Sequence, residues 1–202
     1  MVTKPEIYTK NDLDKLGNAL IFLCQKLSPF TEVSKTHLLK LIFIIEETSV
    51  MRFGIPFFNL RFDVWKLGPV SKDLFVELSD EPTLLADYIR KDETEKGRFT
   101  ICPQRDFSDD EFSDQEIGLM EEVAERFKYC TAKELINFTH RKNSPWYLTA
   151  QKHGVVEALE AGQMNTTNIE IDLSDIISED VQKLSLYHTH KEFLSQSKSL
   201  KF

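Results

Sequence analysis

The chain has 202 residues, 41% of them hydrophobic, which suits one folded domain of ordinary size, and its formal net charge is −8. This charge, without any dense run of lysines and arginines, argues against nucleic acid and favours a basic or mixed-charge protein as the partner. The three cysteines are far apart in the sequence, which argues against a disulfide framework and a zinc ribbon. The longest apolar run is too short to span a membrane, and the first residues lack the layout of a signal peptide, so we expect a cytoplasmic protein.

The first third of the chain predicts two helices. Leucines recur at three- and four-residue intervals over residues 11–27, and Ser28-Pro29 ends this pattern. Ser34 is a suitable N-cap for a second helix over residues 35–53, which Gly54 would end as a C-cap glycine. The second helix is apolar around most of its circumference, so we expect it to lie at the centre of the fold.

A strand is predicted directly after these helices. Side chains over residues 58–67 alternate in the period of two that is typical of strands, and we expect Gly68-Pro69 to end the strand. A helical pattern resumes at residues 70–78.

The next segment predicts a short helix and a second strand. Pro82 suits the first turn of a helix over residues 82–90, residues 91–97 are charged and turn-like, and residues 98–102 suggest a strand. We therefore expect an α+β fold that is mainly α: a compact helical domain with a small antiparallel β-sheet or hairpin.

Two capping boxes mark helices in the second half of the chain. Ser113 with Glu116 predicts one helix start, and Thr131 with Glu134 predicts another whose helix ends near His140. Because one or two residues separate these helices, we expect a tight helical corner.

The C-terminal part is less regular. Residues 144–146 begin a turn or short helix, and residues 169–173 alternate in a way that leaves strand and helix both open. Ser178 is a plausible N-cap for a last helix through residue 193, and we expect the polar end from residue 195 to fray.

A search for chemistry finds no legible catalytic site. The phosphate-binding glycine loops and the G-x-S-x-G nucleophile motif do not occur in the sequence. His188 and His190 are two residues apart, so on a helix they point away from each other, and a zinc site would need further ligands from elsewhere. A surface helix that carries two histidines is the better explanation. Cys130 and His140 could be imagined as a nucleophile and its base, but Cys130 between two helices is better explained as a small buried hydrophobe. We expect a binding protein that is not an enzyme and has no metal or cofactor.

DNA binding is the alternative function. Residues 131–142 could form the recognition helix of a helix-turn-helix, since Lys133, Asn137 and Arg141 are residue types that read bases. The acidic side chains of Glu121 and Glu122 just upstream count against this hypothesis.

These motifs, taken in order, resemble the Panacea domain, also called the SocA-like antitoxin domain. Its front half is similar to residues 38–46 (LLKLIFIIE), residues 54–56 (GIP) and residues 62–74 (FDVWKLGPVSKDL). Its back half is similar to residues 112–116 (FSDQE), residues 131–135 (TAKEL), Thr139-His140 and Pro145-Trp146. The resemblance spans residues 16–176, although residues 42 and 43 replace the tyrosine usual in the first motif.

The resemblance implies a mainly helical domain with a small sheet, over residues 1–176, followed by a C-terminal helix and tail over residues 177–202. It implies the antitoxin half of a bacterial or phage toxin–antitoxin pair, which neutralises a cognate toxin by direct binding. Delivery of the toxin to a protease occurs in the family, and homo-oligomerisation is left open. The family has no established catalytic residues to transfer.

Six residues that match the family signature are our candidates for binding the partner: Trp65, Lys66, Gly68, Pro69, His140 and Trp146. Tryptophan and histidine at loop ends are good interface anchors. A structural role is the alternative for most of them. Gly68-Pro69 could form a strand-to-helix turn, and Trp146 could be a core anchor. His140 could lie at the C-terminal end of a helix, where the helix dipole favours histidine.

Overall fold

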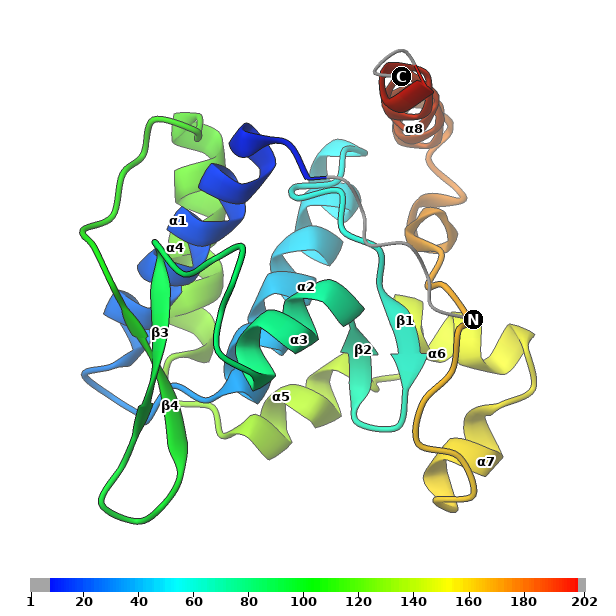
Figure 1. Cartoon of the computed structure of the whole chain (residues 1–202). Helices are drawn as coiled ribbons and strands as arrows, with labels where there is room; N and C mark the ends of the chain where they lie inside the picture. Colours follow the sequence, from blue (N-terminus) through cyan, green and yellow to red (C-terminus); the bar gives the residue numbers. More distant parts are fainter. Residues whose placement is uncertain (1–7, 200–202) are drawn as a thin grey trace.

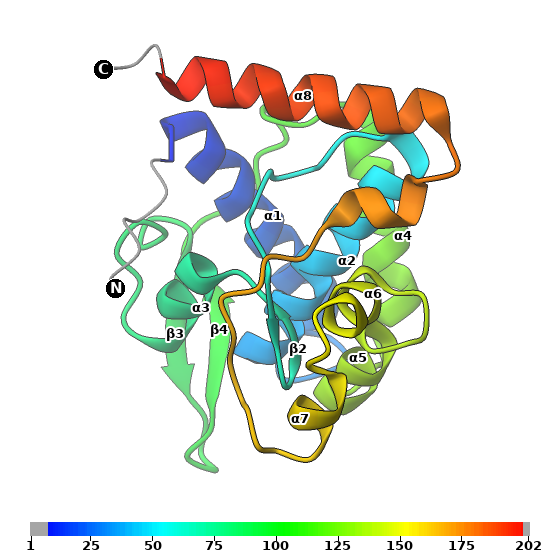
Figure 2. The same cartoon turned by 90° about the vertical axis from the view of Figure 1, so that its right-hand side faces the viewer.

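The computed structural model describes residues 8–199. Helix α2 (Lys35–Phe53) lies at its centre (Figures 1 and 2), α4 (Asp114–Phe127) and α5 (Ala132–Thr139) pack against it, and α1 (Lys10–Leu27) packs on α4. Thirteen residues of α2 are buried, on all sides of the helix. The prediction that this helix is central is therefore confirmed.

The helix ends are fixed by local hydrogen bonds. The predicted capping boxes at Ser113 and Thr131 both form, and the hydroxyl of each residue accepts the backbone N–H of the glutamate three residues on. Ser34 caps α2 as predicted, with His37 rather than an acidic residue as its reciprocal partner. Gly54 ends α2 in the left-handed conformation, with φ of 72°.

Two separate antiparallel hairpins take the place of one sheet. Strand β1 (Asp63–Trp65) pairs with β2 (Gly68–Val70), and β3 (Ile89–Glu93) pairs with β4 (Phe99–Pro103). The expected fold class, mainly α with a small antiparallel hairpin, is confirmed. The expected bounds of the first strand are wrong at both ends, because residues 58–62 lie outside the strand, the chain turns after Trp65, and Gly68-Pro69 begins the second strand. Gly68 has φ of 94°, a conformation that glycine adopts readily and that lets the chain reverse there.

The helix predicted over residues 82–90 does not form. The carboxylate of Glu77, in α3 (Lys72–Ser79), accepts the backbone N–H groups of Thr83 and Leu85 and holds the chain in a turn. Residues 91–93, expected to be part of a turn, belong to β3 and pair with β4.

The chain returns to β1 near its C-terminal end. After α6 (Pro145–Lys152) and α7 (Val156–Glu160), the backbone N–H of Val64 donates to Ile169 O at 2.9 Å and that of Ile171 donates to Phe62 O at 2.8 Å. The alternation at residues 169–173 thus corresponds to extended chain beside β1, and a 3₁₀ helix, η1 (Leu173–Ile177), follows.

The last helix, α8 (Val181–Ser199), crosses one end of the helical body (Figure 2). Ser178 ends η1 rather than capping α8, and Asp180 takes the capping role by accepting the N–H of Lys183. Tyr187 is buried, and Lys183 Nζ donates to Met51 O, so α8 packs on the end of α2. The division of the chain at residue 176 stays a prediction. None of the helices in the described part of the chain combines the length and apolar character that a membrane span requires.

Gly54 generates the first testable prediction. A Cβ there would lie 2.7 Å from Lys183 O, and φ is positive, so we predict that Gly54→Ala lowers the free energy of unfolding by about 1–2 kcal/mol or more. The matched control is Gly118→Ala, within α4, where no heavy atom lies within 4 Å of the added carbon and a gain of about 0.5–1 kcal/mol is expected. Urea unfolding of both variants measures the difference; equal losses at the two positions would contradict this account of the α2 C-cap.

Candidate functional site

The structure brings together the β1–β2 hairpin and the corner between α5 and α6. The indole N–H of Trp146 donates to Trp65 O at 2.9 Å. The ring of His140 stacks on Trp146, with centroids 3.9 Å apart and planes at 15°. The six candidate residues come from two segments far apart in the sequence and belong to one assembly: Trp65, Lys66, Gly68, Pro69, His140 and Trp146.

Most of this assembly faces the interior. Gly68, Pro69 and Trp146 are buried, and the other three candidates are half-buried. The exposed apolar side chain of the hairpin is Leu67, at 59% exposure, which the sequence analysis passed over. Partner contact through the six candidates stays a prediction, and their observed contacts hold the hairpin on the helical body.

Lys40 is a second residue that the sequence analysis did not select. It is 1% exposed in the middle of α2, and its Nζ donates to Pro69 O at 2.8 Å. Gly68 makes this approach possible, since a Cβ there would lie 2.7 Å from Thr139 Oγ1 and 3.1 Å from Lys40 Cε. The available signal was a lysine that interrupts the most apolar run of the chain.

Burial sets the protonation of this assembly. Desolvation lowers the pKa of Lys40 to about 7. Desolvation and the nearby charge of Lys40 lower the pKa of His140 to about 4, so its imidazole is neutral at pH 7. Nε2 of His140 is buried without a hydrogen-bond partner in the described part of the chain. His140 therefore behaves as a flat packing surface against Trp146.

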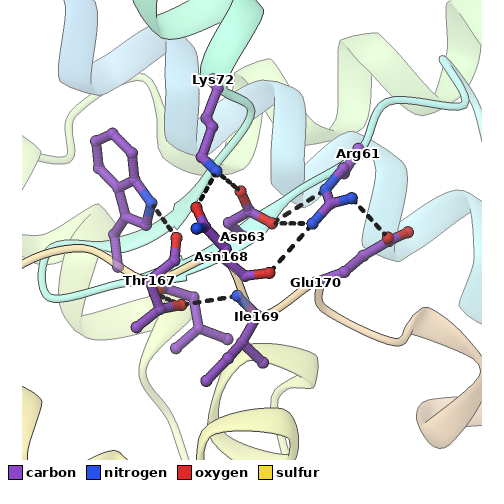
Figure 3. A network of polar contacts seen from close by, with 9 residues as sticks. Arg61, Asp63, Lys72, Thr167, Asn168, Ile169 and Glu170 are labelled. Carbon is purple, nitrogen blue, oxygen red and sulfur yellow. Dashed lines mark hydrogen bonds and ion pairs between the residues drawn. The ribbon is translucent and has the colours of Figure 1, made fainter. Parts of the chain in front are cut away.

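A polar network clamps the other side of the hairpin (Figure 3). The buried carboxylate of Asp63 accepts from Arg61 at 3.1 Å and pairs with Lys72 Nζ at 2.7 Å. Lys72 also donates to Asn168 Oδ1 at 2.6 Å, and Arg61 donates to Asn168 O at 3.1 Å. These contacts join β1, the start of α3 and the returning C-terminal segment.

Trp65 belongs to the same clamp. Its indole N–H donates to Thr167 O at 3.2 Å, while Thr167 Oγ1 donates to Val64 O at 2.7 Å. Both tryptophans of the chain thus use their N–H groups on backbone carbonyls around β1.

The corner considered for DNA binding is partly engaged within the fold. Arg141 pairs with Glu47 at 2.5 Å, while Lys133, Asn137 and Lys142 are exposed. DNA reading by this corner stays a prediction.

Cys130, expected to be a small buried hydrophobe, is only half-buried, and the absence of a catalytic role for these candidates stays a prediction. Burial raises the pKa of Cys130, and it raises that of Cys24 to about 12, which disfavours the thiolate form. The ring of His190 lies 2.7 Å from Asn59 Oδ1. Within residues 8–199, no group of three or more His, Cys, Asp or Glu side chains is placed to hold a metal ion.

The region that contains the hairpin and the corner matches a known family. The family model described as "Antitoxin SocA-like, Panacea domain" matches residues 38–147, more than half of the chain. The match runs from α2 into α6, so it contains Lys40, the whole β1–β2 hairpin and the corner with His140 and Trp146. Comparison with curated proteins gives no match, and neither does comparison with solved structures. The chain belongs to the SocA-like antitoxin family, as its motifs predicted.

Lys40 generates the second prediction, which concerns pH. The unfolded chain keeps the lysine proton up to about pH 10.4, whereas the folded chain releases it near pH 7. Between these values the unfolded state binds more protons, so stability rises with pH. We predict that the unfolding free energy of the wild type increases by roughly 3 kcal/mol relative to Lys40→Met between pH 6.5 and 9.5.

Denaturant unfolding across this pH range measures that difference. Lys133→Met, an exposed lysine on α5, is the control and should run parallel to the wild type. A difference between wild type and Lys40→Met that is independent of pH would show that Lys40 keeps an ordinary pKa.

Proposed function

We propose that this protein is an antitoxin that neutralises a cognate toxin protein by binding it directly. The observation that carries the proposal is the family match over residues 38–147, which contains the complete hairpin-and-corner assembly. The acidic net charge of −8 fits a basic or mixed-charge protein partner.

The hairpin tip suits a binding surface. Leu67 presents an exposed apolar side chain, and the turn that carries it is fixed from both sides. Lys66 N–H donates to Asn165 O at 2.9 Å, and Trp146 holds the carbonyl of Trp65. A tip that is already ordered loses little conformational entropy on binding, so its contacts contribute more fully to affinity.

The proposal assigns no catalysis, metal or cofactor to this chain and places its action in the cytoplasm. A neutral His140 stacked on Trp146 and a Cys130 whose pKa is raised by burial support a binding role over nucleophilic chemistry. Delivery of the toxin to a protease, homo-oligomerisation and a phage origin stay predictions from the resemblance.

Co-expression with the product of the adjacent gene tests the proposal. That product alone should arrest growth, and this protein should restore growth and be recovered with it in a pull-down. Normal growth of cells that express the neighbour alone would contradict the toxin–antitoxin function.

The third prediction concerns the hairpin tip. We predict that Leu67→Asp weakens toxin binding by about tenfold or more, since truncating or charging an exposed anchor at an interface commonly costs over 1 kcal/mol. Leu84→Asp, a leucine of similar exposure outside the hairpin, is the matched control and should bind as the wild type does. Titration calorimetry with the purified toxin measures both affinities; equal affinities for the two variants would exclude the tip from the interface.

A further inference from the structure

A groove between α2, α4 and the end of α5 combines an apolar floor with three arginines. Its volume is about 390 Å³. The floor includes Phe127 and Phe138, and the cations are Arg52, Arg126 and Arg141. We call this feature the arginine groove. It lies outside the hairpin-and-corner assembly, although Arg141 directly follows His140 in the sequence.

The three arginines differ in how they are paired. Arg52 pairs with Glu122, and Arg141 pairs with Glu47, whose side chain is only 4% exposed. Within residues 8–199, Arg126 has no carboxylate at ion-pair distance. Its guanidinium carbon lies 5.2 Å from the centre of the Phe127 ring and 5.3 Å from that of Phe138.

This arrangement suits an incoming carboxylate. The aromatic rings hold the guanidinium of Arg126 by cation–π contact and leave its hydrogen-bond donors available. A planar guanidinium fork matches a carboxylate in two parallel hydrogen bonds. Arg141 also lies over the Phe138 ring, at 4.2 Å from its centre, but its Nη1 donates to Phe138 O and its Nη2 pairs with Glu47, so Arg126 is the arginine that would bind the carboxylate. Met51, 47% exposed at the rim, adds an adaptable apolar contact.

The length and charge of the surface favour a peptide segment over a nucleic acid. A second hollow of about 470 Å³ adjoins the groove, since both are lined by Glu47, Met51 and Arg141. Asp175 and Glu179 line this second hollow. The phosphates of a continuous nucleic-acid backbone would be repelled by these carboxylates. A protein segment can instead place acidic residues beside the arginines and neutral residues beside the carboxylates.

We propose that the arginine groove binds an acidic segment of a partner protein, one in which apolar side chains lie between the carboxylates. We take the partner to be the toxin, so the inference rests on the proposed function. The chain as a whole is acidic, so the groove sets the orientation of a mixed-charge partner on it.

A display library of short random peptides, panned on the full chain, tests the groove without knowledge of the toxin. Enriched peptides should be acidic and apolar, and Arg126→Met should weaken their binding by about tenfold or more. This variant removes the charge and keeps an apolar stem on the rings. Arg90→Met, on the β3–β4 hairpin, removes an exposed arginine elsewhere and should leave binding unchanged. Thermal melts of both variants establish that they are folded.

Three outcomes would overturn the inference: enrichment of basic peptides or of none, equal binding by wild type and Arg126→Met, and displacement of the peptide by a DNA duplex. The last would point to nucleic acid in the groove. Rescue from the toxin separates this inference from the proposed function. If the wild type and Arg126→Met bind the toxin with equal affinity and both neutralise it, the groove is wrong and the antitoxin function stands. If the wild type fails to neutralise the toxin, the proposed antitoxin function is wrong. The peptide experiment then tests the groove independently of that function.

Discussion

The hydrogen bond from buried Lys40 to the carbonyl of Pro69 joins the central helix to the β1–β2 hairpin. A lysine amine inside an apolar helix is unfavourable unless it has a partner, and leaving either group unpaired would cost about 1–3 kcal/mol. The hairpin supplies that partner, and Gly68 lets the backbone approach closely enough to do so. Without this contact, α2 would keep an unpaired buried amine and the hairpin an unpaired buried carbonyl.

The other contacts of the hairpin-and-corner assembly surround this hydrogen bond. Trp146 fixes the carbonyl of Trp65, and the neutral ring of His140 stacks on Trp146. On the opposite side, Asp63 pairs with Lys72 of α3, and Arg61 and Lys72 both donate to Asn168 in the C-terminal return of the chain (Figure 3). The residues of the family signature in the hairpin and corner are thus mostly directed to the interior, where their observed contacts hold the hairpin on the helical body.

Local features of the structure could be predicted from the sequence, and long-range ones could not. The capping residues Ser34, Ser113 and Thr131 mark helix starts because they bond to backbone groups three residues away. The segment after α3 departed from its helical pattern because Glu77 captures the N–H groups of Thr83 and Leu85.

The same distinction applies to the site. The motifs correctly identified the family and selected residues that converge in space, because the order of the motifs carries that information. They did not show that Gly68, Pro69 and Trp146 are buried, nor that Lys40 and Arg126 have special surroundings. Those properties arise from tertiary contacts, between α2 and the hairpin for Lys40 and between α4 and α5 for Arg126, which no local pattern encodes.

The central claim is that the hairpin-and-corner assembly is part of the stable core. Native-state hydrogen exchange tests it most directly at the amide of Val64 in β1, which donates to Ile169 O in the returning C-terminal segment. The account predicts that this amide exchanges only through global unfolding, with the same opening free energy as amides in the middle of α2. Exchange of Val64 at a clearly lower opening free energy than α2 would show that the hairpin opens by itself, and would contradict the account.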